Sequence, residues 1–175
     1  MNLIKAELDK SDYNDSWFFL NYRIDSFWLD EELDNLYPGS LYKGLIPTLL
    51  YGLMDKEEEI VWKTILPSKG EISVCPILMC PDDYDFSCTL IVVEIENYGS
   101  FIQWKQLGID KRTKWFDDEI RYDINWLPEL QSLNFEFKDY QKMIQDFQEQ
   151  YRLDKLKDND NLCQSTVMPS SAIKQ

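Results

Sequence analysis

A hairpin signal in the middle of the chain constrains the fold more than any other feature. Two segments rich in β-branched and aromatic residues, Thr89–Glu96 (TLIVVEIE) and Phe101–Leu107, flank the turn residues Asn97–Ser100. Asn and Gly suit the tight turns that join antiparallel strands, so the sequence predicts a hairpin here. The first segment changes from a continuous apolar run to alternation. This predicts a central strand that is covered on both faces along part of its length.

Other strands and helices are predicted on both sides of this hairpin. Trp17–Ile24 (WFFLNYRI), Ile72–Met79 and Leu133–Phe137 have the composition of strands. Asp30–Leu36 is predicted to be a short helix, and Asp139–Leu156 a longer amphipathic one. Its apolar stripe consists of Tyr140, Met143, Ile144, Phe147 and Tyr151. Strands without regular helical crossovers favour an α+β fold: a mainly antiparallel sheet, a C-terminal amphipathic helix and one or two short N-terminal helices.

Four segments are less clearly patterned. Met1–Ser16 is polar and is expected to be a frayed lead-in, and Gly108–Asp123 is charged and irregular. Leu41–Met54 is apolar but broken by Gly and Pro, which fits a short helix or an irregular core segment. Residues 55–66 fit a helix that begins with a capping box of Asp55 and Glu58, but a strand through Val61–Leu66 competes with it.

The length of 175 residues suits a single domain. We expect a globular domain over residues 1–156 and a flexible polar tail over residues 157–175. Met1–Lys10 lacks the apolar core of a signal peptide, and apolar runs such as Leu90–Val93 are too short to span a bilayer. The expected location is therefore cytoplasmic, without a membrane partner and with reduced cysteines.

The charge balance excludes several function classes. The chain has 32 Asp and Glu, 18 Lys and Arg and no His, which gives a formal net charge of −14. A nucleic-acid partner is not expected, because binding phosphates requires a basic surface. Chemistry that needs a histidine base or ligand is excluded as well. Catalysis, if there is any, would rest on carboxylates or thiols.

Two patterns resemble metal sites but are incomplete. Asp83, Asp85, Ser87, Thr89 and Glu94 occupy ligand positions of a calcium loop. However, Cys88 stands where such a loop requires glycine, and strands flank it instead of helices. The cysteines at 75, 80 and 88 lack the paired spacing of zinc knuckles. We therefore expect no metal and no cofactor, and cysteines that act as small buried apolar side chains.

Catalytic use of a thiol or of carboxylates has little support in the sequence. Glu71–Ser100 contains six acids and no Lys or Arg, and this charge would raise the pKa of a thiol. A carboxylate-based hydrolase remains an alternative, because acids and aromatic residues are abundant, although no spacing selects a pair. We do not expect an enzyme.

Three acidic clusters have aromatic residues beside them. They are Glu57-Glu58-Glu59 near Trp62, Asp82-Asp83-Asp85 around Tyr84, and Asp117-Asp118-Glu119 after Trp115-Phe116. One interpretation is that they are solvated surface that keeps the protein soluble. The other is a docking surface for a cationic protein, in which aromatic side chains provide anchors and the negative field speeds association.

Two stretches resemble a known group of proteins. These are CPDDYDFSCT (residues 80–89), within the longer segment Pro76–Asp110, and YRIDSFWLDEEL (Tyr22–Leu33). With the Phe135/Phe137-x2-Tyr140 pattern that follows, they resemble small acidic bacterial proteins associated with the immunity proteins of polymorphic toxin systems. The resemblance covers most of residues 17–150. One departure is Asp25-Ser26, where the group has Asp-Gly, and it leaves the turn type open.

The resemblance implies a non-catalytic α+β protein that binds one toxin and blocks it. Many such toxins are nucleases with basic clefts, for which an acidic protein is a suitable inhibitor. The expected contact residues are Asp83, Tyr84, Asp85, Trp115, Asp117, Asp118 and Glu119. Cys80, Pro81 and Asp82 are expected to shape the loop, with Asp82 or Asp83 capping backbone N–H groups. We expect a monomer or weak dimer; an acidic adaptor or regulatory subunit of a larger assembly is the second alternative.

Overall fold

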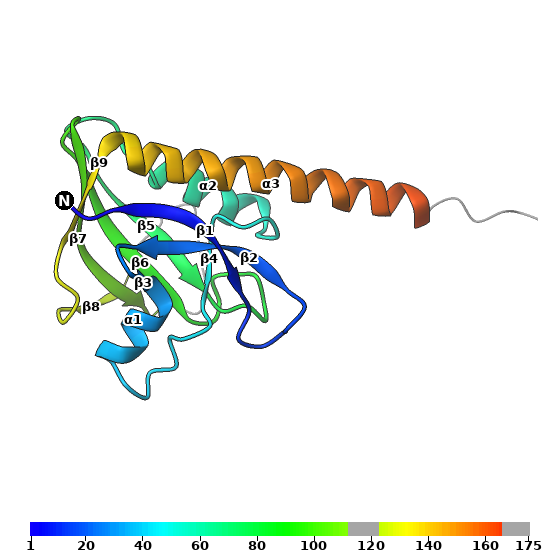
Figure 1. Ribbon diagram of the computed structural model, residues 1–175, viewed down its shortest axis with the longest axis horizontal. Coiled ribbons are helices and arrows are strands. Elements are labelled where there is room, and N and C mark those ends of the chain that lie inside the picture. Colours follow the sequence, from blue (N-terminus) through cyan, green and yellow to red (C-terminus); the bar gives the residue numbers. More distant parts are fainter. Residues whose placement is uncertain (112–122, 166–175) are drawn as a thin grey trace, which may run out of the picture.

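The computed structural model describes residues 1–111 and 123–165, with side chains up to residue 159. This part of the chain forms strands and helices in the order shown in Figure 1. The strands are β1 (Ile4–Lys10), β2 (Phe18–Ile24), β3 (Phe27–Trp28), β4 (Ile46–Pro47), β5 (Ile72–Met79), β6 (Leu90–Asn97), β7 (Phe101–Asp110), β8 (Ile124–Leu127) and β9 (Leu133–Glu136). The helices are α1 (Leu29–Leu36), α2 (Asp55–Thr64) and α3 (Phe137–Ser165).

The strands form two antiparallel sheets. The larger one has six strands, in the order β4-β5-β6-β7-β8, with β9 also paired to β7. β8 pairs with residues 107–110 of β7 and β9 with residues 101–104, so both lie along the same edge of β7. The smaller sheet has the order β1-β2-β3. The predicted α+β fold with a mainly antiparallel sheet and a C-terminal helix is thus confirmed.

The hairpin that dominated the sequence is formed by β6 and β7. Residues Leu90–Val93 of β6 are fully buried, whereas Glu94 and Glu96 farther along the strand are half-buried. Lys105 on β7 lies 3.4 Å from the Glu94 carboxylate and 3.2 Å from that of Glu96. The change from a continuous apolar run to alternation therefore marks the point where one face of β6 becomes polar.

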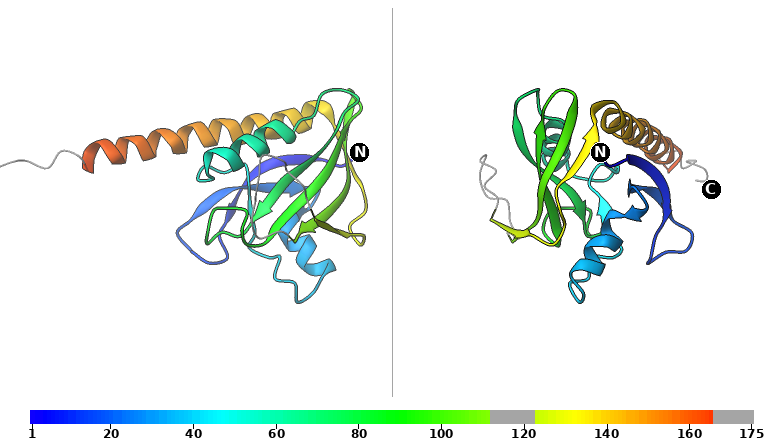
Figure 2. Two further views of the ribbon diagram at one scale, coloured as in Figure 1. Left: turned by 180° about the vertical axis from the view of Figure 1, so that it is seen from behind. Right: turned by 60° about the vertical axis from the view of Figure 1, so that its left-hand side comes forward.

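Aromatic side chains fill the core between the two sheets. Figure 2 shows the arrangement of the two sheets from two further directions. Tyr22 of β2 meets Trp104 of β7 edge to face, with ring centroids 5.9 Å apart. The indole N–H of Trp104 donates a hydrogen bond to the Tyr140 hydroxyl (3.1 Å), which donates to the carbonyl of Ile65 (2.9 Å). Phe135 packs against both Trp104 and Tyr140. This network joins β7, α3 and the end of α2.

α3 is longer than the sequence predicted. Tyr140, Met143, Ile144 and Phe147 of the predicted stripe are buried, and Tyr151 is half-buried. The last part of the helix extends past the body of the protein (Figure 1), and the helix continues through residues 157–165, where a flexible tail was expected. Residues 166–175 of that tail lie outside the described part. No helix in the described ranges is both long and apolar enough to span a membrane.

Three uncertain segments are resolved by the structure. The predicted lead-in is wrong for residues 4–10, because β1 pairs with β2 along its full length. Residues 55–64 are helical, so the helix alternative is confirmed; however, its N-cap is Met54, without a side-chain cap, and the capping box is wrong. Leu41–Met54 is irregular apart from the short strand β4, as one of its two alternatives stated.

Candidate functional site: an apolar groove beside α3

An open groove lies where the β1–β2 hairpin passes beneath the outer half of α3. Its volume is about 380 Å³. The hairpin provides an apolar wall, α3 provides a polar wall, and two tyrosines from loops complete the lining. The lining residues are Leu8, Trp17, Phe18, Phe19, Leu20 and Leu50, then Tyr51 and Tyr84, and finally Gln150, Asp154 and Lys157.

The groove exists because the apolar face of the β1–β2 hairpin extends farther than the apolar stripe of α3. One face of the hairpin carries Tyr22, Leu20 and Phe18 on β2, with Leu8 directly opposite Leu20 on β1. Tyr22 contacts Phe147 of α3, with ring centroids 5.2 Å apart. About two to three turns later, α3 presents Asp154 and Lys157 to the groove instead of apolar residues. The hairpin therefore continues to offer apolar side chains where the helix no longer covers them.

The exposure of these side chains reflects this mismatch. Tyr22 has no exposed surface, whereas Phe18 is 54% exposed and Leu8 is 63% exposed. Exposed apolar residues are individually common, but a group of them that lines a concave surface is typical of a binding site. Trp17 stacks on Phe19 with ring centroids 4.8 Å apart, which gives this wall a rigid aromatic base.

Tyr84 lines the groove and has an unusual backbone conformation. Its φ is +50°, in the left-handed region that few non-glycine residues adopt. Its ring packs on Gly52, where an added Cβ would lie only 2.6 Å from Cδ1 of Tyr84. Burial, followed by the charge of Asp154, raises the pKa of Tyr84 to about 12. The phenol thus stays protonated at neutral pH and is able to donate a hydrogen bond.

The polar wall is organised by pairs within α3. The amide of Gln150 donates to the Asp154 carboxylate (2.9 Å), and Lys157 lies 3.1 Å from the same carboxylate. Beside this wall, the Tyr51 hydroxyl donates to Asp158 (3.0 Å). The lining of the groove therefore holds one acid and one base.

The residues predicted from the acidic loop have different roles. Asp83 is exposed, as expected for a contact residue, whereas Tyr84 is turned into the groove. Asp85 accepts hydrogen bonds from the backbone N–H (2.7 Å) and the hydroxyl (2.6 Å) of Ser87, so it caps a turn. That capping role had been assigned to Asp82 or Asp83. The predicted contacts Trp115, Asp117, Asp118 and Glu119 lie outside the described residues.

The structure brings together three side chains that the sequence did not group. The sulfur atoms of Cys80 and Cys88 and a carboxylate oxygen of Asp83 lie within 4.8 Å of one another. Cys80 is half-exposed and Cys88 exposed, so the expectation of buried apolar cysteines holds for Cys75 alone among the cysteines whose side chains are described. Glu94, the last residue of the calcium pattern, does not belong to this cluster. Its carboxylate lies 3.4 Å from Lys105 instead.

The cluster of Glu57, Glu58 and Glu59 is not a uniform docking surface. Glu57 is buried, and its Oε1 accepts the backbone N–H of Phe86 (3.1 Å). Glu58 accepts the hydroxyl proton of Tyr151 from α3. Only Glu59 is exposed among these three. Glu57 therefore links α2 to the 80–89 loop, and Glu58 links α2 to α3.

Most of the groove was not predicted from the sequence. Trp17 and Phe18 were assigned to a strand without a surface role, and Leu8 lay in the expected lead-in. The sequence did contain one signal for the groove, which is the run of four consecutive apolar residues at 17–20. Such a run places apolar side chains on both faces of a strand, so one face stays exposed unless both are covered.

Comparison with known proteins finds no relative of this chain. The chain matches no protein-family model, no curated protein and no solved structure.

Proposed function

We propose that the protein is a non-catalytic immunity protein that binds a cationic protein toxin in the bacterial cytoplasm and blocks it. The exposed apolar groove between the β1–β2 hairpin and α3 carries this proposal. A volume of about 380 Å³ fits one or two anchoring side chains of a partner rather than a whole domain. The surrounding surface would complete the interface, as in complexes where a few buried anchors supply most of the affinity.

The chemistry of the partner follows from the groove and the charge around it. Trp17, Phe18 and Leu8 favour an aromatic or aliphatic anchor. The net charge of −14 favours a partner with Lys and Arg around that anchor, because opposite fields raise the association rate. A toxin with a basic cleft, such as a nuclease, has this combination.

Binding is favoured over hydrolysis by the acids of the groove. Glycoside hydrolysis requires two carboxyl groups that face the substrate. Among the described residues that line the groove, Asp154 is the only carboxylate, and it is paired with Lys157. Burial raises the pKa of Asp30 and of Glu57, but neither side chain lines the groove.

A growth assay tests the proposal. The toxin domain encoded beside this gene is expressed in a bacterial host with and without the protein, and growth is recorded. We expect the wild type to restore growth and Phe18→Ser to lose protection. Ile72→Ser is the matched control, since Ile72 is a strand residue of similar exposure (53%) on β5. Absence of a toxin gene beside this one, or equal protection by the wild type and Phe18→Ser, would contradict the proposal.

A further inference from the structure

The loop between β5 and β6 places three metal-binding side chains close together. Cys80 follows directly after the end of β5, and its backbone N–H donates to the carbonyl of Thr89 (3.2 Å), just before β6. This bond brings Cys88 back beside Cys80. The turn that begins at Pro81 then carries Asp83 to the same point, so that the two sulfur atoms and a carboxylate oxygen lie within 4.8 Å of one another.

These three groups have the chemistry of a zinc site. Tetrahedral zinc binds thiolate sulfur at about 2.3 Å and carboxylate oxygen at about 2.0–2.2 Å, which separates the ligand atoms by roughly 3.5–3.8 Å. The three ligand atoms, all within 4.8 Å of one another, lie near this range. Thiolates select zinc over calcium and magnesium, which prefer oxygen ligands. Cys80 and Cys88 are both accessible from solvent, so an ion has a path to the site.

The charge of the loop also leaves the three ligands free of competition from nearby cations. Glu71–Ser100 contains no Lys or Arg, so no cation of this stretch competes for the three ligands.

We propose that Cys80, Asp83 and Cys88 bind one zinc ion, with a fourth position left for water or for a donor from a partner. Binding displaces the protons of the two thiols and closes the loop from residue 80 to residue 88. Because Tyr84 lies inside this loop, the ion would also fix a side chain that lines the groove. Zinc binding is measured on the free protein, so its failure and the failure of the proposed immunity function are distinguishable.

The test uses the reduced, metal-free full chain. Titration with Co²⁺ should give one equivalent of thiolate-to-cobalt charge-transfer absorption with the visible bands of tetrahedral Co²⁺, and Zn²⁺ should displace it. Zn²⁺ should also protect Cys80 and Cys88 from alkylation, as mapped by peptide mass spectrometry. Cys88→Ser and Asp83→Asn should each weaken Zn²⁺ binding by more than about tenfold, since even the loss of an outer hydrogen-bond partner of a ligand costs roughly 10–100-fold.

Asp82→Asn is the matched control, because it removes the same charge from an exposed neighbour of Asp83 in the same loop. It should leave Zn²⁺ affinity within about twofold of the wild type. The proposal is overturned if no Co²⁺ absorption appears, if Cys88→Ser binds as tightly as the wild type, or if Asp82→Asn and Asp83→Asn weaken binding equally. A Cys80–Cys88 disulfide that persists under reducing conditions and excludes the metal would overturn it as well.

Discussion

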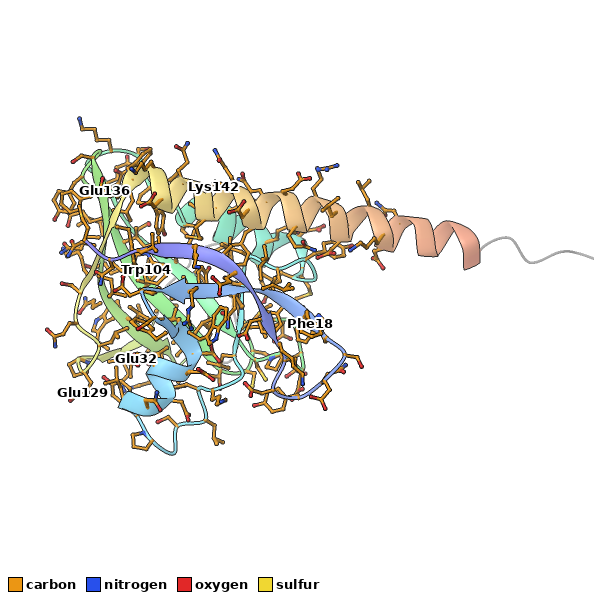
Figure 3. All side chains as sticks on the ribbon, viewed as in Figure 1. Phe18, Glu32, Trp104, Glu129, Glu136 and Lys142 are labelled. Carbon is orange, nitrogen blue, oxygen red and sulfur yellow. The ribbon has the colours of Figure 1, made fainter. Side chains whose placement is uncertain are left out.

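Two aromatic clusters in this molecule are built from similar residues but differ in how fully the rest of the protein covers them. The core cluster around Trp104 is enclosed by both sheets and α3, and its indole N–H and tyrosine hydroxyl are hydrogen-bonded. The groove cluster around Trp17 and Phe18 has apolar partners on one side only. Figure 3 shows the contrast: Trp104 lies inside the body, and Phe18 lies at the end of the hairpin nearest to the outer half of α3.

The difference shows that apolar content alone does not decide what an aromatic residue does. The core cluster stabilises the fold because its rings are covered and the polar atoms of Trp104 and Tyr140 are paired. The groove cluster leaves apolar area uncovered, which contributes little to folding but remains available to a partner. Substitutions in the two clusters should therefore separate stability from binding.

The largest effect is expected from Trp104→Ala in the core. Trp104 has no exposed surface, and its removal leaves a cavity and deprives Tyr140 of its indole donor. We expect a loss of about 3–5 kcal/mol in the free energy of unfolding, measured by urea denaturation. Trp104→Phe, which keeps much of the volume, should lose less. A loss below about 1 kcal/mol for the Ala variant would contradict the assignment of this cluster to the core.

An intermediate effect is expected from Gly52→Ala, at the border between the two regions. The φ of Gly52 is +137°, and an added Cβ would lie 2.6 Å from Cδ1 of Tyr84. Strain and this collision should lower the free energy of unfolding by about 1–3 kcal/mol. Gly39→Ala is the control, since Gly39 also has a positive φ (+87°) but no atom within 4 Å of an added Cβ. If both variants lose the same amount, the packing of Tyr84 on Gly52 is unimportant.

A smaller effect, with a defined pH dependence, is expected from Glu57→Gln. Burial, which Asp85 reinforces, raises the pKa of Glu57 above its ordinary value. Between that ordinary pKa and the raised one, the folded state holds more protons than the unfolded state. The contribution of Glu57 to stability therefore falls as the pH rises through this window. Glu57→Gln removes the titration, so the variant should gain stability relative to the wild type as the pH rises from the ordinary pKa of a glutamate through the raised one.

Urea denaturation at several pH values between these limits measures this gain. Glu59→Gln, at an exposed position of the same helix, is the control for the loss of one charge. A difference between Glu57→Gln and the wild type that stays constant with pH would contradict the raised pKa of Glu57.

The smallest effect on stability is expected from Phe18→Ser in the groove. Phe18 is 54% exposed and lies opposite Lys10 on β1. Its replacement should change the free energy of unfolding by no more than about 0.5 kcal/mol, as surface substitutions usually do. A loss comparable to that of Trp104→Ala would show that the groove is part of the core, and the contrast between the two clusters would then fail.

The two regions also differ in how well the sequence predicted them. The β6–β7 hairpin and the buried stripe of α3 follow from short-range patterns, because apolar periodicity and turn residues act within a few positions. Strand β1 was missed although Ile4, Ala6 and Leu8 alternate with Lys5, Glu7 and Asp9, since the charged residues suggested a solvated segment. Half-buried edge strands have this composition when one face lies on a core.

The groove and the cysteine cluster were not predictable for a different reason. The groove depends on where α3 passes over the hairpin, which is a matter of tertiary packing. The cluster depends on the positive φ of Tyr84 and on the backbone bond between Cys80 and Thr89. Neither the spacing of Cys80, Asp83 and Cys88 nor their composition determines this loop conformation.

The central claim is that the groove cluster binds and does not stabilise. Isothermal titration calorimetry of the toxin domain against the wild type, Phe18→Ser and Ile72→Ser tests it most directly. We predict that Phe18→Ser raises Kd by at least about thirtyfold, the loss expected for an anchor worth about 2 kcal/mol, while Ile72→Ser leaves Kd within about twofold. Equal Kd values for Phe18→Ser and the wild type, with the toxin domain bound, would contradict the claim.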